Sequence, residues 1–425
     1  MVLFQRYSSR FFHLVAIITA TLAFCIIPPL EVVSGGAISV TLAIASIPFL
    51  GLLIADKQWQ WIKLPVWRWF LALMMLGFLS CLWALHPDRA IHVSHLVFNT
   101  VVPGIVFVVG LWYLTQKQSS WIVFAIVGGF LCGLAFLTEE YVSNGFVSRW
   151  WRFVVNRKEQ DVFSLDLLNK SVQFMTPYSF AVAALCLRWC KPSFLVGAWI
   201  GIALVISQLH SLAGQLGFIL GSVAMLLYYR TNGRIVNVFI ALVMITPVII
   251  PLLLMMIDDP FIHQYGPHLP LSSLHRLYIW QRYMLHLKHA LPWGLGIGNT
   301  EHLDNLQNMP QALLDAHIEI PLRHPHNMWF QLYLELGFLG VILFAGFVIC
   351  LLLGIHRLNH HLVFRSLCMA SLVNYLFIGM VDYDMWRDRW ITAAFMCIGV
   401  IGVGRNLNAL SNQRKSTPFI PANTP

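Results

Sequence analysis

The sequence predicts an all-α protein that crosses a membrane about twelve times. Of its 425 residues, 58% are hydrophobic and only 11% are charged, a balance that is unusual for a water-soluble domain. A bilayer-spanning helix needs roughly 20 predominantly apolar residues. Stretches of this kind are centred near residues 22, 45, 76, 105, 129, 179, 200, 220, 246, 341, 372 and 397. We therefore treat residues 1–425 as a single integral membrane domain.

Two of these stretches need comment. The first has basic residues before it and runs into Pro28 and Pro29 without a small-residue cleavage site, so we interpret it as a retained helix. The stretch near residue 179 has the weakest pattern, because Pro177 and several polar residues interrupt it.

The distribution of basic residues predicts the orientation. With the amino terminus in the cytoplasm, the inner face holds fifteen Lys and Arg residues and one acid, Asp56, whereas the outer face holds twelve basic residues and sixteen acids. The positive-inside rule then predicts two cytoplasmic termini, with residues 405–425 as a cytoplasmic tail. The net charge of +9 is a topology signal. Because the basic residues form no continuous patch, we expect no nucleic-acid partner.

Two outer loops are long enough to carry function, at residues 139–170 and 258–325. The larger loop contains residues 275–290, where Leu277, Trp280, Met284 and Leu287 recur at helical spacing. This pattern predicts an amphipathic helix on the membrane surface. Its basic residues, Arg276, Arg282 and Lys288, would face phosphate groups, which arginine binds through two parallel hydrogen bonds. The alternative is ordinary snorkelling towards lipid headgroups.

Glycines at 294, 296 and 298 follow this helix. No strand precedes them, so a dinucleotide-binding fingerprint is not indicated, and we expect a tight turn packed beneath the loop.

A His-Pro-His-Asn run at residues 324–327 stands at the mouth of the next apolar helix. That helix carries Asn327, Gln331 and Glu335 on one face, and such groups are costly at membrane depth unless they face protein or water. We expect Glu335 to be structural, and glycines 337 and 340 to permit close helix packing.

Metal binding is a weaker alternative for this region. His324 and His326 could chelate an ion together, but no third ligand is recognisable nearby. The eight cysteines lie in or beside the apolar stretches, which predicts neither a disulfide framework nor a metal cluster. Asp382 and Asp384 are expected to pair with Arg387 and Arg389.

Several of these residues together resemble the O-antigen ligase family, which also includes O-antigen polymerases. The resemblance rests on Arg276 with Trp280 four residues later, Pro292-Trp-Gly-Leu-Gly-Ile-Gly, His326-Asn327, and Glu335-Leu-Gly-Phe-Leu-Gly340. It is strongest over residues 270–345, with weaker agreement at residues 168–170 and 207–217.

The resemblance implies a GT-C-like glycosyltransferase of the bacterial inner membrane with a periplasmic active site. The donor would be a glycan on undecaprenyl diphosphate, and the acceptor of a ligase would be the lipid A core oligosaccharide. It implies inverting chemistry with no metal or other cofactor. Arg276 would stabilise the diphosphate leaving group. His326 would accept the proton of the incoming hydroxyl, since a histidine with an ordinary pKa is largely neutral at neutral pH. Asn327, Trp280 and Arg282 are further candidates for substrate binding.

The sequence departs from the family at one position. Many members have an arginine after a serine at the outer start of a middle helix, and here Leu212 follows Ser211. The role of the missing cation could pass to any of four other residues, which are His210, Arg149, Arg152 and Lys170.

Two alternatives to a ligase remain open. A polymerase would extend lipid-linked glycan units and would often show two long outer loops, a pattern that residues 139–170 keep possible. A transporter of lipid-linked sugars would show charged residues along a central path, whereas Glu335 is nearly the only ionisable residue deep in the predicted spans.

Overall fold

The computed structural model describes residues 2–57, 59–156, 168–187, 189–209, 211–257, 259–303, 311–315 and 324–415. Its longer helices are α1 (Val2–Val33), α2 (Ala37–Ala55), α3 (Pro65–Leu79), α4 (Pro87–Trp112), α5 (Gln116–Val142), α6 (Phe146–Asn156), α7 (Asn169–Cys186), α8 (Pro192–Gln208), α9 (Leu212–Arg230), α10 (Val236–Leu254), α12 (Leu271–Ala290), α14 (Met328–His356), α15 (Leu362–Val381) and α16 (Asp388–Lys415). Short helices are η1 (Gln60–Lys63), η2 (Ser80–Leu82), α11 (Asp259–Tyr265), η4 (Gly266–His268), η5 (Asn299–His302) and α13 (Gln311–Asp315).

The predicted all-α membrane fold is confirmed. All twelve predicted centres fall inside helices, and in the described ranges ten helices are long and apolar enough to span a membrane. The two that fall short are α7 and α8. They still run along the bundle, because the Ser211 hydroxyl just after α8 lies 3.5 Å from the carbonyl of Asn169 at the start of α7. The start of α7 and the end of α8 therefore lie at the same end of the bundle.

Helix α7 is too polar to qualify by composition because it lies inside the protein. Its residues from Ser171 to Val182 are all buried, so neighbouring helices rather than lipid satisfy its polar groups. Pro177 has no N–H to donate to the Gln173 carbonyl, and the hydroxyl of Thr176 lies 3.5 Å from that carbonyl instead. The Ser371 hydroxyl of α15 donates to the Pro177 carbonyl at 2.8 Å. The interruptions that weaken the sequence pattern are thus packing contacts.

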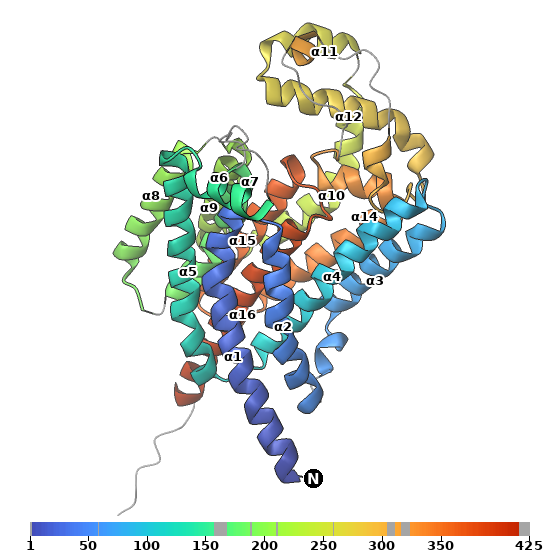
Figure 1. Cartoon of the computed structure of the whole chain (residues 1–425). Coiled ribbons are helices and arrows are strands. Elements are labelled where there is room, and N and C mark those ends of the chain that lie inside the picture. The colour runs from blue at the N-terminus through green and yellow to red at the C-terminus, as the bar shows by residue number, and fades with distance from the viewer. Residues whose placement is uncertain are drawn as a thin grey trace, which may run out of the picture.

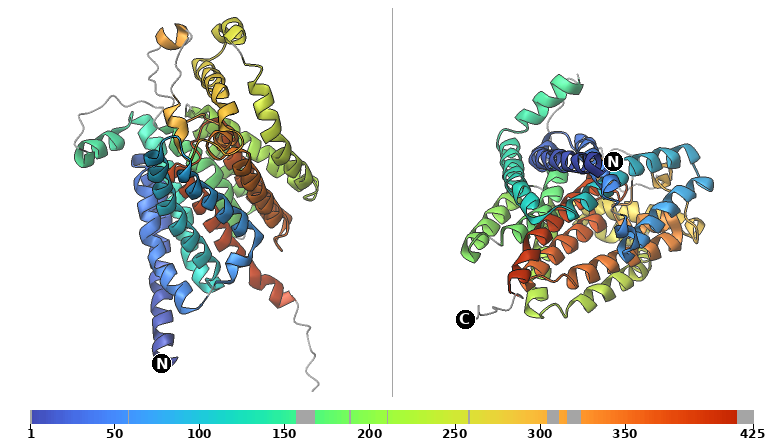
Figure 2. Two further views of the ribbon diagram at one scale, coloured as in Figure 1. Left: turned by 90° about the vertical axis from the view of Figure 1, so that its right-hand side faces the viewer. Right: turned by 90° about the horizontal axis from the view of Figure 1, so that it is seen from below.

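The connections between helices gather at two opposite ends of the bundle (Figure 1). At the lower end, His13 lies 3.5 Å from Asp56 and Gln116 donates to the Leu407 carbonyl at 2.9 Å. At the upper end, Ser39 donates to Asp388 at 2.9 Å. The start of α1 and the end of α16 both lie at the lower end (Figures 1 and 2). Helix α16 continues to Lys415, so it includes residues that we expected to form the tail.

Additional helices cover the upper end, which is the end predicted to face outwards. Helix α6 projects sideways beside α5, and α12 lies across the tops of α10 and α14 (Figures 1 and 2). A helix is therefore present where the amphipathic one was predicted, extended by four residues at its start, but its apolar residues are not concentrated on one face. Leu274, Tyr278, Ile279 and Tyr283 are buried on it, so much of its apolar surface packs on protein.

Helix α14 is broken at Gly337, where φ is +64°. The break frees the carbonyls of Leu334 and Glu335, which accept the N–H groups of Leu295 and Gly296 at 2.8 and 2.9 Å. Glycines 294, 296 and 298 all have positive φ, as the predicted tight turn requires. We had expected Gly337 to permit close packing of a helix. It makes room for the 292–298 turn instead.

Candidate active site

His326 lies in the extended segment that leads into α14, at the upper end of the bundle. Its backbone adopts φ +50°, an uncommon conformation for a residue with a side chain. Its N–H lies 3.2 Å from Nδ1 of His324, and the two imidazole rings are 4.1 Å apart. Asn327 is the N-cap of α14 and accepts the N–H of Phe330 at 3.0 Å. The Asn327 side chain thus stabilises the start of α14, directly after His326.

Asp382, at the end of α15, joins the basic residues of the site. Its carboxylate lies 3.2 Å from Nη2 of Arg276, 2.9 Å from Nζ of Lys170 and 3.3 Å from Nδ1 of His326. Gln173 also donates to it. Residues that are more than 200 positions apart therefore meet around one carboxylate, and we refer to Lys170, Arg276, His326 and Asp382 as the Asp382 cluster.

Helix α12 explains the four-residue spacing of Arg276 and Trp280. Both residues lie on one face, where Nε of Arg276 donates to the Val381 carbonyl at 3.0 Å. The indole N–H of Trp280 donates to the Pro325 carbonyl at 2.7 Å. One turn of α12 thereby holds the end of α15 against the entrance to α14. Trp280 contributes to the site by fixing the segment that carries His326.

Of the four candidates for the missing cation, only Lys170 is described as part of the cluster. The guanidinium of Arg149 contacts carbonyls of its own helix start, at Gly145 and Ser143. The side chain of Arg152 and all of His210 lie outside the described residues. Arg282 is 7% exposed and its guanidinium stacks on the ring of Tyr278 at 5.1 Å, which gives it a packing role in α12.

The surroundings favour the ionised form of Asp382 and the neutral forms of His275 and His324. Burial raises the pKa of Asp382, but hydrogen bonding from His326 and the charge of Lys170 outweigh it, so the pKa lies well below the ordinary value. Burial and the neighbouring His326 and Arg276 lower the pKa of His275 to about 4. Burial and His326 also hold the pKa of His324 well below its ordinary value. An ionised Asp382 therefore faces fixed cations, beside two neutral histidines.

A second carboxylate, that of the fully buried Glu335, supports the site from below. It is fully buried and accepts from the Gly298 N–H at 2.7 Å, the Thr300 hydroxyl at 2.6 Å and the Gln331 amide at 3.1 Å. The indole of Trp386 also donates to it. These contacts support the structural role that we expected, although they attach a loop rather than neighbouring helices.

Our expectation for Asp382 and Asp384 was wrong. Arg389 pairs with Glu31 of α1 at 2.6 Å. Asp384 accepts from the Gln331 amide at 2.8 Å and from the Trp386 N–H at 3.0 Å. A signal was available in the sequence, because Asp382 follows an apolar stretch at the same predicted outer face as His326. The partners of Asp382 could not be read from the sequence, since they come from α7, α12 and the segment before α14.

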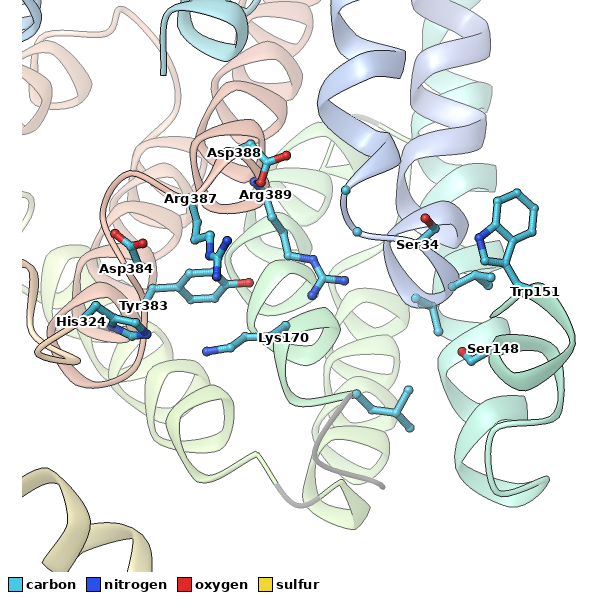
Figure 3. Close-up of a pocket in the computed structure, with 15 residues that line it drawn as sticks. Ser34, Ser148, Trp151, Lys170, His324, Tyr383, Asp384, Arg387, Asp388 and Arg389 are labelled. Carbon is cyan, nitrogen blue, oxygen red and sulfur yellow. The ribbon is translucent and has the colours of Figure 1, made fainter. Parts of the chain in front are cut away.

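A cavity of about 480 Å³ adjoins the Asp382 cluster (Figure 3). Lys170 and His324 line it on the side of the cluster, and Tyr383, Asp384, Arg387, Asp388 and Arg389 form another wall. The α1–α2 turn and α6 close it with residues 32–36, Ser148 and Trp151. Among the described residues, no group of three or more His, Cys, Asp or Glu side chains is arranged to hold a metal ion.

Fold and site define a multi-pass membrane protein with cations, a histidine and a carboxylate at one end of its helical bundle, beside a polar cavity. Residues 195–345 match the family model described as O-antigen ligase. This match, like the motifs of the sequence, supports an O-antigen ligase family for the chain.

Curated relatives agree with this assignment over most of the chain. A candidate polysaccharide ligase of Rickettsia conorii is 26% identical over 352 residues, which cover 82% of each chain. Proteins with the same description are 26% identical in Rickettsia typhi and 27% identical in Rickettsia felis, and each alignment covers 74% of this chain. The similarity therefore extends well beyond the matched family region.

Proposed function

We propose that the protein is an O-antigen ligase, which transfers a glycan from undecaprenyl diphosphate to the lipid A core oligosaccharide on the periplasmic face of the inner membrane. The observation that carries this proposal is the Asp382 cluster, in which Arg276, Lys170 and His326 converge at the end predicted to face outwards. Similarity to the O-antigen ligase family and to polysaccharide ligases supports a glycan-transferring enzyme of the ligase or polymerase type that acts on a lipid-linked glycan.

Arg276 and Lys170 supply positive charge for the leaving group. Breaking the bond between the anomeric carbon and the diphosphate oxygen leaves negative charge on that oxygen, which fixed cations stabilise. The guanidinium of Arg276 is held by the carbonyls of Val381 and Ser272, at 3.0 and 3.2 Å. In the substrate complex, phosphate oxygens would share Arg276 and Lys170 with the Asp382 carboxylate.

His326 accepts the proton of the attacking hydroxyl. Its Nδ1 lies 3.2 Å from the Asp382 carbonyl and 3.3 Å from the Asp382 carboxylate, which favours the tautomer with the proton on Nδ1 and leaves Nε2 as the acceptor. As the acceptor oxygen bonds to the anomeric carbon, its proton moves to Nε2 and the lipid diphosphate departs. Attack opposite the leaving group inverts the configuration at that carbon.

A polymerase remains the second candidate. It would use the same cluster to join two lipid-linked glycan units, and family membership includes both reactions. The names of the Rickettsia relatives favour the ligase.

Reconstitution of the purified protein with lipid-linked glycan, with and without lipid A core, tests the proposal. Glycan on the lipid A core supports a ligase, and longer glycans on the polyprenyl carrier would indicate a polymerase. Absence of transfer under both conditions would contradict the enzyme assignment and favour a transporter. The same assay with a chelator should keep full activity. A loss that a divalent cation restores would contradict the metal-independent mechanism.

A further inference from the structure

The cavity beside the Asp382 cluster contains a buried hydroxyl group without a partner. Tyr383 is 2% exposed, and its hydroxyl makes no hydrogen bond in the described structure. The ring is fixed, because it stacks on Trp390 at 4.3 Å and carries Nζ of Lys170 4.4 Å from its centre. Figure 3 shows the hydroxyl directed into the space that Lys170 and Arg389 border. Burial raises the pKa of Tyr383, so the group stays protonated and is available as a donor.

The same cavity has a cation that no described side chain neutralises. Arg387 is exposed on the cavity wall and no ion pair or side-chain hydrogen bond is recorded for it among the described residues. Arg389, in contrast, is paired with Glu31 at 2.6 Å. The two carboxylates of the wall already accept hydrogen bonds, Asp384 from Gln331 and Asp388 from Ser39. Among the described groups of the cavity wall, the Tyr383 hydroxyl and the Arg387 guanidinium are thus two available donors, which suit an anionic oxygen.

The position of the cavity connects it both to the reacting groups and to the membrane surface. His324 lines it, and the imidazole of His324 lies 4.1 Å from that of His326. On the other side, α6 contributes Trp151 to the cavity wall and exposes Phe146, Trp150 and Phe153, which are 63%, 55% and 58% exposed. An apolar face of this kind is typical of a helix at a lipid interface. A molecule in the cavity would lie beside His326 and next to lipid headgroups.

We propose that this cavity binds the acceptor, through an anionic substituent on a sugar of a membrane-anchored glycan, with Arg387 and the Tyr383 hydroxyl as its ligands and Trp151 stacking on the sugar. A phosphate or a carboxylate would meet the two donors equally well. The proposal rests on the proposed transferase function, because it assigns the second substrate of the same site. The donor diphosphate would occupy the opposite side of the cluster, at Arg276.

Binding of acceptor alone to the full-length protein in lipid nanodiscs provides the test. The probes are a core oligosaccharide that carries one sugar phosphate, the same oligosaccharide after phosphatase treatment, and free inorganic phosphate. We expect the phosphorylated probe to bind the wild-type protein about tenfold more tightly than the dephosphorylated one, as a charged hydrogen-bonded contact would give. Inorganic phosphate alone should bind weakly, since it lacks the sugar that packs on Trp151.

Two variants locate the contact. Arg387→Gln should abolish the preference for the phosphorylated probe, and Tyr383→Phe, which removes a single oxygen atom, should reduce it several-fold. Arg357→Gln, at the opposite end of the bundle after α14, is the matched control and should bind as the wild type does. Equal binding of the two oligosaccharides, or a preference that survives Arg387→Gln, would overturn the proposal.

This binding measurement is independent of glycan transfer because no donor is present. A protein that binds the phosphorylated probe through Arg387 but transfers no glycan would refute only the transferase function. One that transfers glycan without the phosphate preference would refute only the acceptor cavity.

Discussion

At the scale of single residues, Asp382 organises the site. Burying a carboxylate is costly unless charges and hydrogen bonds compensate it, and Lys170, Arg276 and His326 do so at 2.9 to 3.3 Å. The same contacts orient the imidazole of His326 and hold two cations beside it. One carboxylate therefore positions both the group proposed to accept a proton and the groups proposed to stabilise the leaving diphosphate.

Replacement of the reacting groups should remove activity without unfolding the protein. We expect His326→Ala and Arg276→Ala each to lower glycan transfer at least about 100-fold, the loss typical when a general base or a charge-stabilising donor is removed. Both side chains are partly exposed, at 23% and 25%, so insertion and thermal unfolding should change little. Transfer assays on reconstituted variants measure this, with Arg357→Ala as the control. Near-normal transfer by either variant would contradict its assigned role.

The depressed pKa of His275 predicts how stability depends on pH. A histidine in the unfolded chain titrates near its ordinary pKa of about 6.5, whereas folded His275 titrates at about 4. Between these values only the unfolded state takes up the proton, so stability falls as the pH is lowered from 6.5 towards 4. The His275→Gln variant should therefore lose less thermal stability than the wild type between pH 7.5 and pH 5.0. Equal losses would contradict the neutral state of the partly buried His275. His324 remains in the variant, so some loss should persist.

At the scale of elements, the break in α14 and the 292–298 turn form one unit. Carbonyl groups exposed by a break at membrane depth need other donors, and the turn supplies the N–H groups of Leu295 and Gly296. Glu335 attaches the far side of the same turn through Gly298 and Thr300. The glycine-rich motif, Glu335 and Gly337 thus act together as a scaffold beneath His326.

A side chain at position 337 should disrupt this unit. Gly337 has φ +64°, and a Cβ atom there would clash with the Pro292 carbonyl oxygen. We expect Gly337→Ala to destabilise the protein by at least about 2 kcal/mol, from the backbone strain and the clash together. Gly354→Ala is the matched control in the same helix, because nothing lies within 4 Å of its added carbon. Comparable denaturation midpoints for the two variants would show that the turn does not pack on α14 in this way.

At the scale of the whole molecule, the bundle separates two sets of connections. One end has the start of α1 and the end of α16, and the other has α6 and α12 (Figure 1). The cavity and the Asp382 cluster lie at this second end, where α6 contributes Trp151 to the cavity and α12 contributes Arg276 to the cluster. A site confined to one end suits a reaction between two lipid-anchored substrates that meet at one membrane surface.

Cysteine labelling tests the predicted orientation and the paths of α7 and α8. In a background without the native cysteines, Asn144→Cys should react with an impermeant maleimide applied from the periplasm. Asn359→Cys and Lys191→Cys should react only after the inner membrane is opened, since twelve crossings place both in the cytoplasm. All three positions are exposed. Labelling of Lys191→Cys from the periplasm would mean that α7 and α8 do not cross the membrane.

Much of the fold was predictable from sequence because lipid imposes a simple rule on lipid-facing helices. A helix in contact with lipid must be apolar along its length, and ten helices in the described part of the chain meet this condition. The rule fails for α7, which is shielded from lipid and carries buried groups such as Gln173 and Thr176. In the site, Arg276 and His326 followed from family motifs, whereas Asp382 was assigned the wrong partners.

The sequence by itself determined the membrane class, the approximate places of the helices, the resemblance to the O-antigen ligase family and the two residues proposed to act on the substrates. These features depend on composition, periodicity and short motifs, which are local. Only the tertiary structure decided that Lys170, Arg276 and His326 share Asp382, that the glycine turn fills the break in α14, and that Tyr383 and Arg387 face a cavity. These contacts join residues far apart in the chain, so they depend on how the helices pack.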